Sequence, residues 1–213
     1  KWKRSTYQIF RDNWANPAFG GGDKQPGIWW DTYINDIHFI SIDGRYYRTN
    51  PKKTKGKLSM LGSVQKRWLL NTIKGSTGTF KVLVSPVPWV FKAKGDSKDT
   101  WNGFKNERNE IFQFLTENNI KGVLLMSADR HRSDLWKIER SDDYALYEFN
   151  SSRLTNQHVH KTMDEAIYSY NAKQSFGTVD FDTKADDPKV TYAVHSIDGE
   201  QIYKFTVKRS QLE

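Results

Sequence analysis

The chain has 213 residues and a formal net charge of +8 at pH 7, with 14% aromatic residues and no cysteine. The missing cysteines exclude disulfides, zinc–thiolate sites and cysteine nucleophiles, and the aromatic content excludes a wholly disordered chain. The apolar runs are much shorter than the roughly 20 residues that span a bilayer, so no membrane span is expected.

The positive charge suits an anionic partner, such as nucleic acid, an acidic membrane or a phosphorylated substrate. The lysines are, however, scattered along the chain. We therefore interpret them mainly as a solvated surface and do not expect nucleic acid as a partner.

The first two predicted elements are an amphipathic helix and a buried strand. Residues 5–14 place Tyr7, Phe10 and Trp14 at helical spacing, which predicts a helix with one apolar face. A glycine-rich loop follows. The apolar run at residues 37–42 then ends at an Asp-Gly pair, which is typical of a buried strand closed by a turn.

Two helices and two further strands alternate after this strand. Ser63 is the expected N-cap of the first helix, and Gly75 is its expected C-terminal stop. In the second helix, Ile111, Phe114 and Leu115 are expected to face the core. The predicted helices cover residues 63–74 and 105–118, and the predicted strands cover residues 80–85 and 122–127.

This alternation of strands and helices is the signature of parallel βαβ units. In a parallel sheet the carboxyl ends of the strands lie along one edge, where ligands bind. The residues expected at that edge are Asp43, Ser85 and the segment 127–131. The sequence therefore predicts a functional site there.

The last third of the chain has the pattern of antiparallel strands. Asp198-Gly199 is a strong two-residue hairpin turn, and residues 141–143 separate two other strand-like runs. The predicted strand pairs are residues 134–139 with 144–149 and residues 190–196 with 201–207. We expect one α/β domain over residues 1–213, in which a parallel βαβαβ part is followed by antiparallel strands.

The sharpest chemical feature is Asp129-Arg130-His131, just after a predicted buried strand. An acid and a histidine two residues apart on a loop can turn toward one point, and their oxygen and nitrogen suit a divalent or trivalent metal ion. The arginine between them could face a phosphate or pair with a carboxylate. The alternative is that Asp129 caps a turn and His131 is a partly exposed loop residue. Asp43, at the end of an earlier strand, is more often a capping residue than a ligand.

Two other groups of residues have both a functional and a structural interpretation. The alternating imidazoles of His158 and His160 could bind a metal ion, but we favour a polar loop. Trp29, Trp30 and Trp89 could form a stacking platform for sugars or bases, but we favour packing in the core or at its rim.

Four stretches resemble motifs of the PhoD-like (alkaline phosphatase D) family of metallophosphoesterases, in the same order and with similar spacing. Residues 127–134 (SADRHRSD) are similar to the family's closing metal motif, S-G-D-R-H, with Ala128 in place of the glycine. The other three stretches are residues 10–17 (FRDNWANP), 41–48 (SIDGRYYR) and 60–69 (MLGSVQKRWL). The resemblance extends over residues 7–156, and the chain end is similar to the family's last strands.

The resemblance implies a metallophosphoesterase-like sandwich, in which two packed sheets flanked by helices hold two metal ions, whether Ca, Fe, Zn or Mn. It implies a hydrolase for phosphate esters, in which a metal-bound hydroxide attacks phosphorus. Asp129 and His131 would be metal ligands. Arg45 and Arg108 would orient phosphate oxygens, the alternative being buried salt bridges that pin their loops. The family also implies a periplasmic or extracellular location.

The chain departs from the family pattern in its metal motifs. Three further ligand motifs of the family would precede Lys1, so we expect the C-terminal half of such a domain, with residues 1–156 as the core match and residues 157–213 as an antiparallel extension. The alternative is a non-catalytic fragment that binds anions or polysaccharides and is inactive without its N-terminal half. Ala128 is also expected to need an unusual backbone conformation.

Overall fold

The computed structural model describes residues 2–155 and 157–213, so Lys1 and the predicted boundary at Asn156 lie outside the described residues. The helices are α1 (Trp2–Asn13), α2 (Gly62–Lys74) and α3 (Lys105–Glu117), and the short 3-10 turns are η1 (Phe91–Lys94), η2 (Trp101–Phe104) and η3 (Arg209–Leu212). The strands are β1 (Trp30–Ile34), β2 (Ile37–Ser41), β3 (Phe80–Val84), β4 (Val123–Ser127), β5 (Ser133–Arg140), β6 (Asp143–Asn150), β7 (Tyr168–Tyr170), β8 (Ser175–Asp182), β9 (Lys189–Ser196) and β10 (Gln201–Lys208). A search of the described helices finds none with the length and apolar character needed to cross a membrane.

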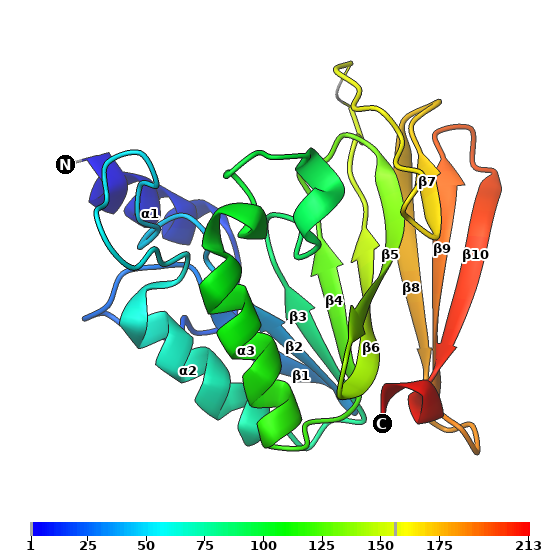
Figure 1. Ribbon diagram of the computed structural model, residues 1–213, viewed down its shortest axis with the longest axis horizontal. Coiled ribbons are helices and arrows are strands. Elements are labelled where there is room, and N and C mark those ends of the chain that lie inside the picture. The colour runs from blue at the N-terminus through cyan, green and yellow to red at the C-terminus, as the bar shows by residue number, and fades with distance from the viewer. Residues whose placement is uncertain (1, 156) are drawn as a thin grey trace.

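The strands form two sheets. In the described part of the chain, seven strands lie in the order β1-β2-β3-β4-β6-β5-β7, and three lie in the order β10-β9-β8. Strands β2, β3 and β4 are parallel neighbours, and β6 is parallel to β4. Helices α2 and α3 cover one face of the larger sheet, and the smaller sheet packs on the other side (Figure 1). The predicted fold class, a mostly parallel α/β sheet followed by antiparallel strands, is confirmed.

The central strands are buried because layers pack on both faces of the larger sheet. The first four residues of β3 are buried, as are the first three of β4, which explains why both are mostly apolar, with Lys81 as the charged exception in β3. Aromatic rings join the two sheets. Phe181 on β8 lies 6.1 Å from Phe39 and 5.6 Å from Phe80, measured between ring centroids. Tyr192 on β9 stacks on Phe149 at 4.8 Å.

The helices lie close to the predicted residue ranges, but the ends of α1 and α2 differ from the prediction. Helix α1 begins at Trp2, and Trp14, which was expected on its apolar face, is 65% exposed beyond the helix end. Helix α2 begins at Gly62, so the prediction of Ser63 as its N-cap was wrong. The hydroxyl of Ser59 instead accepts a hydrogen bond from the N–H of Gly62 at 2.8 Å. The N-cap position falls on Leu61, two residues before Ser63, and Gly62 follows it with a φ of +72°.

Three strands, β1, β7 and β8, were not predicted. Strand β1 pairs antiparallel with β2 at the edge of its sheet, and its residues are half-buried or exposed, so it has no apolar run to reveal it.

Both predicted hairpins are confirmed, as β5 with β6 and β9 with β10. On α3, Phe112 is buried whereas the predicted Phe114 is half-buried. Trp29 and Trp89 are fully buried, as the packing interpretation expected.

Candidate functional site

The loops that follow β2, β3 and β4 lie along one edge of the larger sheet (Figure 1). This is the edge at which parallel strands present their carboxyl ends and at which ligands bind. It carries Asp43, Ser85 and the loop of residues 128–132. The surroundings of these residues differ greatly.

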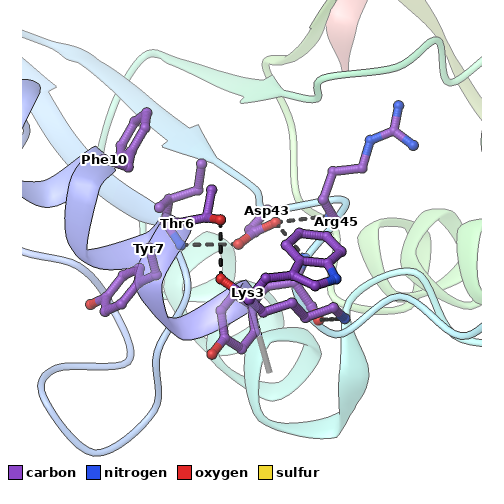
Figure 2. A pocket seen from close by; sticks show the side chains of 9 residues that line it. Lys3, Thr6, Tyr7, Phe10, Asp43 and Arg45 are labelled. Atoms are coloured by element: carbon purple, nitrogen blue, oxygen red, sulfur yellow. Dashed lines mark hydrogen bonds between the residues drawn. The ribbon is translucent and has the colours of Figure 1, made fainter.

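Asp43 is a structural residue of the loop after β2. It is 4% exposed, and its Oδ1 accepts hydrogen bonds from the backbone N–H groups of Arg45 and Tyr46 at 2.8 and 2.9 Å. Its Oδ2 accepts from the N–H of Ile28 at 3.1 Å. Figure 2 shows this carboxylate beside α1, turned toward the backbone that it binds. The capping interpretation of Asp43 is therefore confirmed.

Arg45 lies at the surface in an ion pair. Its side chain extends away from the carboxylate of Asp43 (Figure 2), is 56% exposed, and places Nη1 3.0 Å from Oδ1 of Asp99. Arg48 contacts the same carboxylate at 2.8 Å. Burial acts to raise the pKa of Asp99, but the hydrogen bonds and charges of the two arginines outweigh burial and lower that pKa. Arg45 thus already has an anionic partner within its own chain.

Arg108 lies on α3, beneath the loop that follows β3. It is 8% exposed, and its Nη1 donates to the carbonyl of Trp89 at 3.0 Å. Its guanidinium lies over the ring of Phe91, 3.6 Å from the centroid. Burial lowers the pKa of Arg108 to about 10. These contacts match the alternative in which Arg108 pins a loop, with a carbonyl rather than a carboxylate as the hydrogen-bond acceptor.

Glu148 is a buried acid that the sequence reading did not single out. It is fully buried on β6, and its carboxylate accepts from the N–H groups of Trp89 and Val90, both at 2.9 Å. It also accepts from the hydroxyl of Ser127 at the end of β4. Burial raises the pKa of Glu148. The signal that could have revealed it is a glutamate inside an otherwise apolar strand, because a buried acid needs hydrogen-bond donors.

The loop between β4 and β5 has an unusual backbone. Asp129 and His131 have φ angles of +66° and +49°, in the left-handed region that is unfavourable for residues with a side chain. The expectation for Ala128 was wrong, because the positive angles fall on the residues on either side of Arg130. Backbone conformations of this kind cluster at functional loops.

Asp129 and His131 line the same open cleft, which has a volume of about 470 Å³. The side chain of Asp129 is 39% exposed, and its Oδ2 lies 3.9 Å from Nζ of Lys94. Ser151, Ser152 and Arg153 line the same cleft. The acid and the imidazole are thus accessible to a ligand from one depression, and their joint binding of an ion stays a prediction.

Two arginines anchor this loop from below. Nε of Arg130 and Nη2 of Arg132 both donate to the carbonyl of Ala93, at 2.7 and 2.9 Å. Nε of Arg132 also lies 2.8 Å from each oxygen of Asp134, and this ion pair is almost completely buried, with side-chain exposures of 1% and 0%. The arginine of the Asp-Arg-His triplet therefore binds a backbone carbonyl, rather than a phosphate or a carboxylate.

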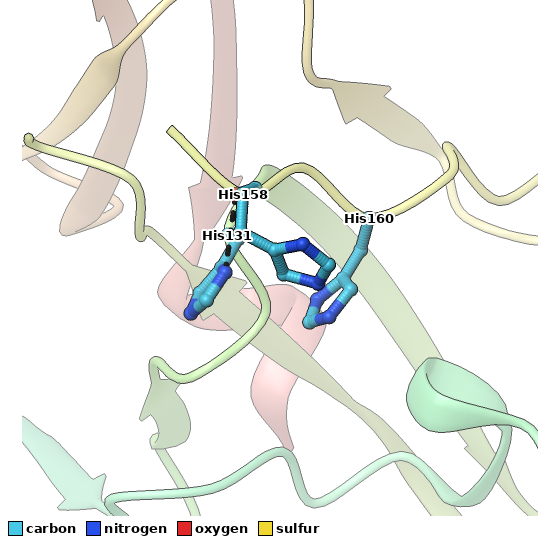
Figure 3. A group of neighbouring side chains, drawn as sticks. All are labelled: His131, His158 and His160. Carbon is cyan, nitrogen blue, oxygen red and sulfur yellow. Dashed lines mark hydrogen bonds between the residues drawn. The ribbon is translucent and has the colours of Figure 1, made fainter. Parts of the chain in front are cut away.

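Three histidines gather beside the loop (Figure 3). The candidate ligand atoms of His131, His158 and His160 all lie within 4.8 Å of one another. The ring of His131 stacks on that of His160, with centroids 4.8 Å apart, and stands nearly perpendicular to that of His158. Residues 157–160 are irregular in backbone, so the histidines lie on a loop as expected, and their grouping keeps the metal-binding alternative open. Their place beside His131 was missed because a separation of 27 residues gives no local sign of contact.

Backbone carbonyls orient two of the imidazoles. Nδ1 of His160 lies 2.6 Å from the carbonyl oxygen of Arg130, and Nδ1 of His131 lies 3.1 Å from that of His158. Because a carbonyl only accepts, each Nδ1 carries a proton, and Nε2 is the nitrogen left to bind an ion. Burial lowers the pKa of His160, which favours the neutral form that binds metal ions. The group fits an ion that prefers nitrogen ligands.

Comparisons with known proteins agree on one family. A profile of the PhoD-like phosphatase family matches residues 24–211. The chain is 27% identical over 119 residues to alkaline phosphatase D of Bacillus subtilis (strain 168), a match that covers 48% of this chain and 20% of that protein. A solved structure titled "Structure of PhoD" is similar with a TM-score of 0.67 at 15% identity, over 96% of this chain and 48% of that chain. The chain thus spans less than half the length of either protein. Because the family profile covers most of its length, the chain belongs to the PhoD-like phosphatase family.

Proposed function

We propose that the chain forms part of a metal-dependent hydrolase of phosphate esters, with its site in the cleft beside the loop between β4 and β5. Membership of the PhoD-like phosphatase family supports the reaction class. The observation that carries the proposal is that Asp129 and His131 line one open cleft at the carboxyl edge of the sheet. The chain would be the C-terminal portion of a metallophosphatase domain, and the family resemblance favours a periplasmic or extracellular location.

In this proposal, an oxygen of Asp129 and a nitrogen of His131 hold a cation. A cation bound there would polarise a phosphoryl oxygen and lower the pKa of the attacking water. Arg153 lines the same cleft, and its guanidinium suits the phosphate oxygens. Arg45 lines a different pocket, beside α1, and pairs with Asp99, so its role in orienting phosphate stays a prediction. Arg108 supports the loop at Trp89.

Hydrolysis of p-nitrophenyl phosphate and bis-p-nitrophenyl phosphate by the natural-length protein tests the proposal. We expect activity that a chelator removes, and a fall of at least about tenfold in kcat/KM for His131→Gln, since even the groups that orient metal ligands contribute this much. His195→Gln is the matched control, because His195 lies on β9 and contacts Thr178 at 3.1 Å. Hydrolysis that survives both the chelator and His131→Gln would contradict the proposal.

The same assay on the 213-residue chain alone separates two versions of this function. Activity in the chain would mean that its own residues suffice. Activity only in the longer protein would mean that the remaining ligands lie outside these residues. A natural-length protein that binds phosphate or polysaccharide but hydrolyses neither ester would favour the non-catalytic alternative.

A further inference from the structure

The segment of residues 157–163 brings two imidazoles to the loop that carries His131. His158 and His160 come from this segment, and their candidate ligand atoms lie within 4.8 Å of each other and of that of His131 (Figure 3). All three side chains are at least partly exposed, so an ion can reach them from solvent. The ligand atoms of this group are all imidazole nitrogens, whereas Asp129 would offer a carboxylate oxygen.

The segment is held in place by hydrogen bonds at His160 and at the residues that follow it. Nη1 of Arg132 donates to the carbonyl of Lys161 at 3.1 Å, and Nδ2 of Asn171 donates to the carbonyl of His160 at 3.0 Å. Arg132 is itself fixed by its buried pair with Asp134. The hydroxyl of Ser169 connects the two parts further, because it donates to Asp134 at 2.6 Å and accepts from the N–H of Met163 at 3.1 Å.

The donor set selects the class of ion. Imidazole nitrogens suit Zn²⁺ and its neighbours in the first transition row, whereas Ca²⁺ and Mg²⁺ prefer oxygen. Nitrogens about 2.0–2.1 Å from a tetrahedral Zn²⁺ lie roughly 3.4 Å from one another. The candidate ligand atoms lie up to 4.8 Å apart, so rotation of the histidine side chains must bring them closer when an ion binds. The backbone carbonyls at Nδ1 of His131 and His160 are the orienting partners that metal-binding histidines usually have.

We infer that His131, His158 and His160 form a binding site for one transition-metal dication of the Zn²⁺ class. The segment of residues 157–163 contributes two of its three ligands. His131 has only Nε2 left for an ion, because its Nδ1 is bonded to a carbonyl, so it binds one ion at a time. The inference rests on the proposed function only in sharing this residue, and the three histidines can bind metal whether or not an ester is cleaved.

Calorimetric titration of the 213-residue chain with Zn²⁺ tests the inference. We expect one ion per chain, with an affinity at least about tenfold weaker in His158→Gln and in His160→Gln, because direct ligands should contribute no less than orienting groups do. His158 is exposed, so its replacement leaves the fold intact, which the circular dichroism spectrum checks. His195→Gln, with its histidine outside the cluster, should bind Zn²⁺ as the unaltered chain does.

Two results would overturn the inference. One is Zn²⁺ affinity that is unchanged in His158→Gln and His160→Gln, and the other is equal loss in His195→Gln. A parallel titration with Ca²⁺ should show no effect of His158→Gln. Failure of the proposed function is distinguishable, since Zn²⁺ bound through these histidines in a protein without hydrolytic activity would contradict only the hydrolase.

Discussion

Asp43 and Asp129 occupy equivalent places in the fold, each just after a parallel strand at the same edge of the sheet, yet their carboxylates are used in opposite ways. Asp43 is buried and accepts three backbone hydrogen bonds. Asp129 is 39% exposed, and its closest cation, Lys94, lies 3.9 Å away. The position of an acid at a strand end thus does not decide its role. What decides it is whether backbone N–H groups saturate the carboxylate, as those of Ile28, Arg45 and Tyr46 do for Asp43.

The largest loss of stability is expected at the buried ion pair between Arg132 and Asp134, next to the exposed loop. Asp134→Ala removes the partner of the buried Arg132, and breaking a buried ion pair from one side costs about 3–5 kcal/mol. We expect the free energy of unfolding, measured by urea denaturation, to fall by this amount. A loss below about 1 kcal/mol would mean that Arg132 finds another partner and that the loop is not clamped from beneath.

The second effect tests the structural role of Asp43. Asp43→Ala leaves the N–H groups of Ile28, Arg45 and Tyr46 without their acceptor. Because hydrogen bonds to charged groups contribute about 1.5–3 kcal/mol each and are not additive, we expect a loss of about 3 kcal/mol in the same measurement. Asp43→Asn, which keeps one acceptor oxygen, should lose less. If Asp43→Ala were as stable as the unaltered chain, Asp43 would not be a structural residue and would not differ from Asp129 in this respect.

A small effect is expected at the exposed acid. Asp129→Asn should change the free energy of unfolding by less than about 0.5 kcal/mol, as is usual for surface substitutions. Asparagine also tolerates the left-handed backbone at φ +66°. Thermal and urea denaturation of this variant beside Asp43→Asn would sharpen the comparison. A large loss of stability at Asp129 would show that its carboxylate is a structural group.

The smallest effect concerns pH and the pair that holds Arg45. The folded pKa of Asp99 is lowered from 3.8 by its arginines, although burial opposes them, so its contribution to stability is complete above the unfolded pKa and is lost as pH falls through the folded value. The stability difference between the unaltered chain and Asp99→Asn should therefore shrink as the pH decreases below 3.8. A difference that is constant from pH 7 to roughly 2 would contradict the assigned shift.

The sequence predicts the fold well where apolar runs and turn residues mark buried elements. Strands β3 and β4 are recognisable because layers cover both of their faces, and the β9–β10 hairpin because Gly199 supplies a positive φ of +83° at the turn. Edge strand β1 cannot be recognised from the sequence, because its residues are half-buried or exposed and so form no continuous apolar run.

Only those residues of the candidate site that are close together in the sequence could be predicted. The Asp-Arg-His triplet after β4 was found from its spacing, and Asp129 and His131 do line one cleft. The neighbourhood of His158 could not be found, because the segment reaches His131 through tertiary hydrogen bonds such as that from Arg132 to Lys161. The burial of Glu148, likewise, depends on donors more than fifty residues away in sequence.

The central claim is that the exposed acid and histidine beyond β4 serve chemistry, whereas the acid beyond β2 serves the fold. The most direct test is kcat/KM of the natural-length protein for bis-p-nitrophenyl phosphate in Asp129→Asn, at saturating metal and with the stability of the variant measured in parallel. We predict a fall of at least about tenfold, the size expected for groups at a metal site, with stability unchanged. Full activity in this variant would contradict the account.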